Sequence, residues 1–168
     1  KGIDVMLISK ASPGKGTCTI VSGGVFAGTE EGQTIQHHLQ RTLKAGRGIN
    51  QQERVNILVD EGPARLREMV DWGIKAEFRR GYLFSKGRPP IWGEEIVNCL
   101  LRKAKALGIR FQSGLIVNDI RVQKGITRAS VFSVDSNEWL AIVAKATVLA
   151  TGGAGALYLR HDNPKRML

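Results

Sequence analysis

The stretch ATVLATGGAGALY, residues 146–158, decides the fold of this chain. Its first half is an apolar run typical of a buried strand, and its second half is a glycine-rich turn. Glycines at the carboxyl end of a parallel strand let backbone N–H groups approach a phosphate or a ring, because no Cβ stands in the way. The stretch therefore predicts a strand over residues 147–150 that leads directly into a ligand-binding turn.

The amino-terminal segment has a matching pattern. Residues 3–8 form a second apolar run suited to a buried strand, and a turn rich in Ser, Pro and Gly follows over residues 9–14. Small residues then continue through residues 15–24. Taken alone, this segment is better explained by an ordinary strand and loop. Combined with residues 146–158, it indicates a site for a flavin nucleotide.

Apolar spacing predicts helices between these two ends. The expected helices cover residues 30–45, 51–60, 63–72 and 94–107. Gly62 and Pro63 are expected to separate the second helix from the third, because proline fits the first turn of a helix and not its interior. Residues 74–92 lack periodicity and are predicted to form a basic loop. Cys99 falls on the apolar face of the last helix, where core packing is its expected role.

The carboxyl-terminal half is rich in β-forming residues. Short β-prone runs cover residues 115–122, 129–134 and 139–143, and they are separated by the turn signals at 124–125 and 135–137. This spacing predicts an antiparallel meander. The right-handed crossover rule places residues 3–8, 109–111 and 147–150 in one parallel sheet, whose carboxyl edge would bind the ligand.

Several short motifs occur along the chain in one fixed order. They are ISK (8–10), TCT (17–19), SGG (22–24), AGRGIN (45–50), WG (72–73), GEEIV (93–97), GI (108–109), ATGGAGALY (150–158) and Asn163-Pro164. In this order they resemble the flavoprotein family of succinate dehydrogenase, fumarate reductase and L-aspartate oxidase, over nearly the whole chain. The ATGGAG block is the most specific part of the resemblance.

The resemblance implies an α/β fold, namely a Rossmann-like FAD-binding domain with a parallel sheet and a β-meander. Two parts of the family pattern are missing. No Gly-x-Gly-x-x-Gly turn precedes Lys1, and the chain stops at Leu168, before the family's Thr-Gly-Asp-Gly motif and capping domain. We therefore expect residues 1–168 to be a partial FAD-binding domain, truncated at both ends, without the first βα unit and the capping domain. By itself this chain is expected to bind FAD poorly and to be inactive.

The resemblance also implies residues for the adenosine side of the cofactor. Ser9 stands where Rossmann folds usually place an acidic residue on the ribose, and Lys10 would approach the ribose or pyrophosphate. Ile116 would offer backbone groups to the adenine. The ribityl and phosphate side would be closed by Ala150, Thr151 and Gly152.

On the flavin side, the resemblance places Thr17 and Cys18 along the ring system. Ser22, Gly23 and Gly24 would give backbone donors to the isoalloxazine ring or the ribityl chain. In the membrane-bound branch of the family, a histidine at the place of Thr17 forms a covalent link to FAD. Threonine has no ring nitrogen to act as the nucleophile, so the cofactor is expected to be non-covalent FAD.

For the intact protein, the resemblance implies an FAD-dependent oxidoreductase that transfers hydride between the flavin and a small dicarboxylate or amino acid. An electron-transfer subunit is a partner that some family members use. The catalytic residues would lie beyond Leu168, so none is named within this chain. A flavin-fold binding or assembly module without catalysis is the first alternative.

The net charge of +10 raises nucleic-acid binding as a second alternative. The basic residues are scattered, however, and lack the interleaved aromatic residues of a base-stacking platform, so this alternative is not favoured. Cys18 and Cys99 lie in no metal-ligand pattern, so no metal site is expected. They are interpreted as reduced, which suits a cytoplasmic protein, or one associated with a membrane through a partner protein. No apolar stretch approaches the roughly 20 residues that span a bilayer.

Overall fold

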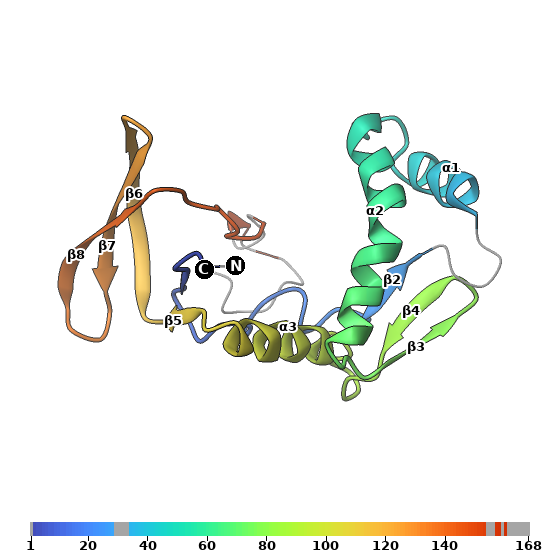
Figure 1. Ribbon diagram of the computed structural model, residues 1–168, viewed down its shortest axis with the longest axis horizontal. Coiled ribbons are helices and arrows are strands. Elements are labelled where there is room, and N and C mark those ends of the chain that lie inside the picture. The colour runs from blue at the N-terminus through green and yellow to red at the C-terminus, as the bar shows by residue number, and fades with distance from the viewer. Residues whose placement is uncertain (1, 29–33, 154–156, 159, 161–168) are drawn as a thin grey trace. The chain divides into compact units, whose positions relative to one another are not determined.

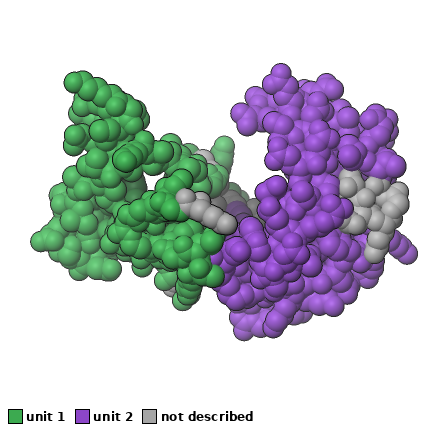
Figure 2. Space-filling view, in the orientation of Figure 1, with its two compact units in different colours: residues 1–17, 104–168 green, residues 18–103 purple. Residues whose placement is uncertain are grey.

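The chain divides into two units, which Figure 2 shows in different colours. The first contains residues 1–17 and 104–168, and the second contains residues 18–103. The structure is a computed structural model that describes residues 2–28, 34–153, 157, 158 and 160. Each unit is described by itself below.

The first unit contains a parallel strand pair and an antiparallel meander. Strand β1 (Met6–Ile8) pairs in parallel with β5 (Arg110–Gln112), with Leu7 opposite Phe111. Strands β6 (Leu115–Gln123), β7 (Ile126–Ser133) and β8 (Glu138–Ala144) form a three-stranded sheet in that order (Figure 1). Both the parallel pairing and the meander are confirmed.

A two-residue turn sets the register of the first hairpin in the meander. Lys124 and Gly125 have φ angles of 50° and 74°, and positive φ at both positions gives the turn the twist that two adjacent antiparallel strands need. Gln123 therefore lies opposite Ile126. On the central strand β7, Val131 is fully buried.

The predicted third parallel strand, over residues 147–150, is wrong. These residues lie outside any helix or strand, and Val148 and Leu149 are 88% and 69% exposed. In the described part of the chain, the parallel sheet contains only β1 and β5, with three residues each. An apolar run indicates that a segment favours burial, but it becomes a strand only where a sheet edge offers hydrogen-bonding partners.

The second unit begins with two helices that contact each other, α1 (Ile35–Ala45) and α2 (Gln52–Asp71). Thr34 caps α1, because its side-chain oxygen accepts a 3.1 Å hydrogen bond from the backbone N–H of His37. The earlier start predicted for this helix falls partly on residues 30–33, which lie outside the described residues.

Helix α2 continues through Pro63, so the predicted interruption at Gly62 and Pro63 is wrong. A proline inside a helix removes one backbone hydrogen bond and crowds the preceding turn. Here, however, Pro63 is itself buried, in line with Val59 and Leu66 on the same face. Burial of this continuous apolar stripe offsets the lost hydrogen bond.

The loop predicted over residues 74–92 is also wrong in its first half. Strands β3 (Ala76–Arg79) and β4 (Tyr82–Ser85) form a hairpin that also pairs with β2 (Val25–Ala27), in the order β2-β4-β3. Arg80 and Gly81 make the turn with φ angles of 51° and 78°. In β3, exposed Glu77 and Arg79 alternate with half-buried Ala76 and Phe78. This alternation of exposed and half-buried residues was not recognised in the sequence, because the region carries many charged residues.

The core of the second unit lies where α2 meets helix α3 (Glu94–Ala106). It contains Met69, Ile74, Ile96 and Cys99, with Phe26, Trp72 and Ala76 packed against them. Cys99 is fully buried, which confirms its predicted packing role. Burial raises the pKa of its thiol, so the thiol is protonated and poorly nucleophilic at neutral pH.

His38 makes the stability of the second unit depend on pH. It is a buried residue of α1, and its Nδ1 has no hydrogen-bond partner among the described residues. Burial, with smaller contributions from Arg41 and His37, lowers the pKa of His38 below 6.5. The unfolded chain therefore binds a proton more readily than the folded chain. Stability should be complete above about pH 6.5 and should fall as the pH drops toward the folded-state value.

Urea unfolding at pH 7.5 and at pH 5.5 checks this prediction. We expect a lower midpoint at pH 5.5, and we expect His38→Leu to make the difference between the two midpoints smaller. His37→Leu is the comparison variant: His37 is exposed and is the smallest of the three causes of the lowered His38 pKa, so its removal should change the pH dependence less than His38→Leu does. An equal pH dependence in wild type and His38→Leu would contradict the assignment.

Candidate functional site

In the first unit, the structure brings three predicted site residues together at the carboxyl end of β1. The backbone hydrogen bonds run from Ser9 N to Gln112 O (2.9 Å), from Leu115 N to Ser9 O (3.1 Å) and from Gly114 N to Lys10 O (3.2 Å). They join the segment after β1 to the β5–β6 connection. Ser9 and Lys10 therefore lie beside the start of β6, where Ile116 is found. This is the sheet edge at which parallel α/β folds bind ligands.

The Ser9 side chain is already used within its own turn. Its hydroxyl donates a 2.5 Å hydrogen bond to the carbonyl of Ala11. The hydroxyl oxygen still has lone pairs and can accept a hydrogen bond from a ligand. An acidic residue at this place would offer two acceptor oxygens, so Ser9 would be the weaker acceptor for a ribose.

The glycine-rich turn of residues 150–153 is exposed and lies outside any helix or strand. Gly152 has a φ of 80°, a conformation that side chains other than glycine rarely adopt. The space where a Cβ would stand is open at both Gly152 and Gly153. Residues 154–156 of the same motif lie outside the described residues. The structure does not test the roles predicted for Ala150, Thr151 and Gly152.

Thr17 and Cys18 follow the turn after β1. The Thr17 hydroxyl donates to the carbonyl of Gly14 at 3.3 Å. Cys18 is exposed and forms no disulfide. Their placement along the flavin stays a prediction.

In the second unit, Ser22 closes residues 19–24 into a compact turn, which we call the 19–24 loop. The Ser22 backbone N–H and hydroxyl both donate to the carbonyl of Thr19, at 3.2 and 2.7 Å. The Gly24 N–H donates to the Ser22 hydroxyl at 3.3 Å. The loop therefore has a defined backbone conformation, and the predicted residues Ser22, Gly23 and Gly24 are its second half. The N–H groups of Ser22 and Gly24 already donate within the loop, so of the three predicted backbone donors the structure leaves the Gly23 N–H for a ligand.

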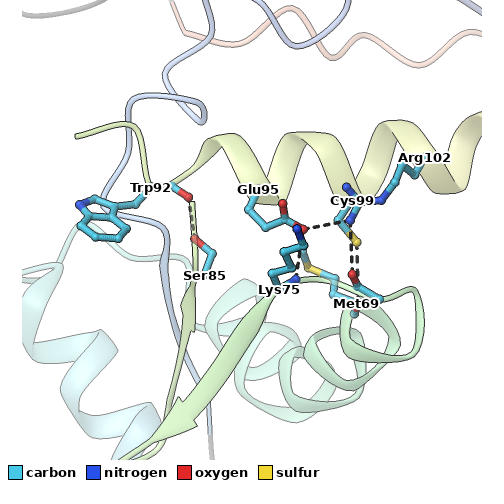
Figure 3. Close-up of polar contacts among 8 residues, drawn as sticks. Met69, Lys75, Ser85, Trp92, Glu95, Cys99 and Arg102 are labelled. Carbon is cyan, nitrogen blue, oxygen red and sulfur yellow. Dashed lines mark hydrogen bonds and ion pairs between the residues drawn. The ribbon is translucent and has the colours of Figure 1, made fainter. Parts of the chain in front are cut away.

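Two neighbouring segments hold the 19–24 loop in place. The N–H of Ser85, the last residue of β4, donates to the carbonyl of Gly24 at 2.8 Å, and the N–H of Gly93 donates to the carbonyl of Ser22 at 3.1 Å. The Ser85 hydroxyl donates to the carbonyl of Trp92 at 2.8 Å (Figure 3). These bonds fix the carbonyls on both sides of Gly23.

Ser85 and Gly93 were not predicted as site residues. Gly93 is the first residue of the GEEIV motif, which is part of the resemblance to the flavoprotein family, but the resemblance implies no role for it. Its function becomes visible only in the packing, because a Cβ on Gly93 would overlap the carbonyl oxygen of Thr19 and lie 2.5 Å from the Ser22 Oγ. Ser85 lay within the predicted loop, where nothing in the sequence distinguishes it.

Arg88, a basic residue of the region predicted as a loop, is paired with Glu94. Its Nε and Nη2 donate to the two carboxylate oxygens at 2.7 and 2.5 Å. This bond raises the pKa of Arg88 and lowers the pKa of the Glu94 carboxyl. The pair is exposed on the arginine side, and the carboxylate takes two of the five guanidinium donors. An exposed ion pair accounts for Arg88 without a ligand.

The described residues give no support to a metal site or a membrane span. They contain no group of three or more His, Cys, Asp or Glu that could hold an ion. Within the same residues, every helix is too short or too polar to cross a bilayer.

A parallel strand pair whose carboxyl edge carries the hydrogen-bonded β5–β6 connection is a feature of nucleotide-binding α/β domains. The family model of the FAD binding domain matches residues 1–167, and the chain belongs to this family.

Individual relatives agree with this assignment. L-aspartate oxidase of Streptomyces coelicolor is 30% identical over 97% of this chain, and a fumarate reductase (CoM/CoB) subunit of Methanothermobacter marburgensis is 28% identical over 91%. The chain covers 31% of each of these proteins. Among solved structures, a quinol-fumarate reductase matches 95% of the chain with a TM-score of 0.81 at 23% identity, and a quinol fumarate reductase of E. coli matches 94% with a TM-score of 0.79. These structures support the fold.

Proposed function

We propose that this chain contributes part of the FAD site of an FAD-dependent oxidoreductase. The observation that carries the proposal is the hydrogen bonding of the 19–24 loop, which is held at the carbonyls on both sides of Gly23. This loop lies in a chain that belongs to the FAD binding domain family. The space beside Gly23 is open where a Cβ would stand, as it is at Gly152 and Gly153. Glycine leaves the backbone N–H groups accessible to a phosphate or a ring, and this supports the proposal that these residues would hold the cofactor.

The residues that would hold FAD fall into three groups. Ser9, Lys10 and the backbone at Ile116 would bind the adenosine and pyrophosphate. Thr17, Cys18 and the Ser22–Gly24 backbone would contact the flavin and the ribityl chain. Ala150, Thr151 and Gly152 would close over the ribityl and phosphate side. When bound, the flavin supplies the hydride chemistry, and the protein supplies orientation and hydrogen bonds.

For the substrate, we propose a small dicarboxylate or amino acid of the fumarate, succinate or aspartate type. The named relatives, an aspartate oxidase and a component of a fumarate reductase, support this class. A partner that transfers electrons and a cytoplasmic location stay predictions. No observation favours nucleic-acid binding over this function, and the family assignment weighs against it.

We predict that the cofactor is bound without a covalent link, because Thr17 has no nucleophilic ring nitrogen. The visible absorption spectrum of the full-length protein, before and after acid precipitation, measures this. We expect a flavin spectrum in the native protein and free flavin in the supernatant after precipitation. Flavin that stays in the pellet would contradict the non-covalent link. A colourless protein that cannot be reconstituted with FAD would contradict the proposed function itself.

Substrate turnover separates an enzyme from a binding module. We expect the flavin-loaded protein to reduce fumarate, or to oxidise succinate or aspartate. Retained flavin without turnover of any of these compounds would favour the module that lacks catalysis.

A further inference from the structure

We propose that Ser85 is a positioning residue for the flavin, which acts by fixing the 19–24 loop. The inference rests on the proposed function, since it takes the Ser22–Gly24 backbone as a flavin contact. Ser85 would not touch the cofactor in this role. It would determine where the backbone of the loop lies, with the Gly23 N–H between the two fixed carbonyls.

Ser85 is suited to this role by its contacts on two sides. It is 6% exposed at the end of β4. Its backbone N–H donates to the Gly24 carbonyl, and its hydroxyl donates to the Trp92 carbonyl, both at 2.8 Å. Figure 3 shows the hydroxyl aimed at the Trp92 carbonyl. Ser85 thus holds the end of the loop directly and also holds the segment that leads into α3.

The second contact reaches the same loop by another route. Gly93 follows Trp92, and its N–H donates to the carbonyl of Ser22 at 3.1 Å. The hydroxyl bond to Trp92 therefore fixes the segment from which Gly93 reaches Ser22. Through one side chain and one N–H group, Ser85 controls the residues on both sides of Gly23.

Close packing makes this arrangement sensitive to small changes. Gly24 has a φ of 65°, and a Cβ at that position would overlap the Ser85 Oγ and lie 3.0 Å from Trp92. The serine oxygen therefore packs directly against the glycine backbone. Loss of the oxygen would leave the Trp92 carbonyl without its donor and open a gap beside Gly24. Because backbone donors bind a rigid ring only at the correct distance and angle, a loosened loop should hold the flavin less well.

Flavin binding by Ser85→Ala in the full-length protein tests the inference. We expect the Kd for FAD to rise by about tenfold, because a loosened loop must be ordered again when the flavin binds. The matched control is Ser133→Ala. Ser133 is 8% exposed, and its hydroxyl accepts a 3.3 Å hydrogen bond from the Ser136 N–H, but it belongs to the meander of the other unit. Both variants should lose some stability, and only Ser85→Ala should lose flavin affinity.

A conservative variant and a flavin-independent measurement complete the test. Ser85→Cys keeps a weak donor of similar shape, so it should restore part of the affinity. Hydrogen exchange of the Gly93 amide should be faster in Ser85→Ala than in Ser133→Ala, with or without flavin. An unchanged Gly93 exchange rate would overturn the coupling between Ser85 and the loop.

The outcomes separate the inference from the function on which it rests. If wild type binds FAD and the two alanine variants bind it equally well, the positioning role is overturned and the proposed function stands. If wild type cannot bind FAD under any condition, the proposed function fails, and the role of Ser85 toward flavin fails with it.

Discussion

The substitution Gly93→Ala is expected to displace the 19–24 loop, with a loss of about 2 kcal/mol in the free energy of unfolding and a loss of at least about tenfold in FAD affinity. A Cβ at Gly93 would overlap the backbone carbonyl of Thr19, and it would also lie 2.5 Å from the Ser22 Oγ. A carbonyl oxygen in a closed turn cannot rotate aside as a long side chain can. The backbone must therefore move, which also breaks the hydrogen bond from Gly93 to Ser22.

The matched control for this substitution is Gly62→Ala. Gly62 lies inside α2, and apart from its chain neighbours and the helix's own backbone an added Cβ there meets no atom within 4 Å. Alanine should leave FAD affinity unchanged and should change stability little, because its higher helix propensity is opposed by the contact of its Cβ with the ring of Pro63. Urea denaturation and FAD titration of both variants give the measurement. Equal stability and equal flavin affinity in Gly93→Ala and wild type would show that the loop accommodates the methyl group.

The features predicted correctly from the sequence are those encoded by local chemistry. The meander follows from β-prone runs joined by Lys124-Gly125, a dipeptide that adopts the positive φ angles a two-residue hairpin needs. Helix α3 follows from acidic residues in its first turn and an apolar face that contains Cys99. The residues that form such a pattern lie close together in the sequence, so the pattern can be recognised without knowledge of the tertiary structure.

The errors occurred where distant residues decide the structure. Residues 147–150 have the composition of a strand but no partner strand in the described part of the chain. Pro63 normally ends a helix, yet the helix continues because its apolar face is buried on both sides of the proline. The β3–β4 hairpin depends on its pairing with β2, about fifty residues earlier in the chain.

The candidate site also contains residues that the sequence located and residues that only the packing reveals. Resemblance to a family located Ser9, Lys10 and Ser22–Gly24, and the structure places the first two beside the start of β6. Ser85 and Gly93 could not be found in this way, because each donates its N–H to a backbone carbonyl more than sixty residues away. A hydroxyl or an absent Cβ acquires such a role only from the packing around it.

Glu95→Ala is expected to lower the free energy of unfolding of the second unit by about 2–3 kcal/mol. The Glu95 side chain is buried, and its Oε1 accepts hydrogen bonds from the Lys75 N–H at 3.1 Å and from Arg102 Nη2 at 2.9 Å (Figure 3). Arg102 also donates to the Gly73 carbonyl at 3.3 Å. Glu95 thus ties the turn after α2 to the first turn of α3. Without it, a partly buried backbone N–H loses its acceptor, which accounts for most of the loss.

The ion pair itself contributes the smaller share, because the Arg102 side chain is half exposed and water can solvate it. Glu68→Ala measures how much an exposed ion pair contributes to stability by itself. Glu68 pairs with Arg65 on the exposed side of α2 at 2.8 Å, so its removal should cost no more than about 0.5 kcal/mol. Urea midpoints of the two variants at pH 7.5 measure the contrast. If both variants unfold at the same urea concentration, the contact between Glu95 and the Lys75 N–H adds nothing beyond an ordinary surface pair. If Glu95→Gln retains most of the wild-type stability, the hydrogen bond to the backbone stabilises the fold more than the charge does.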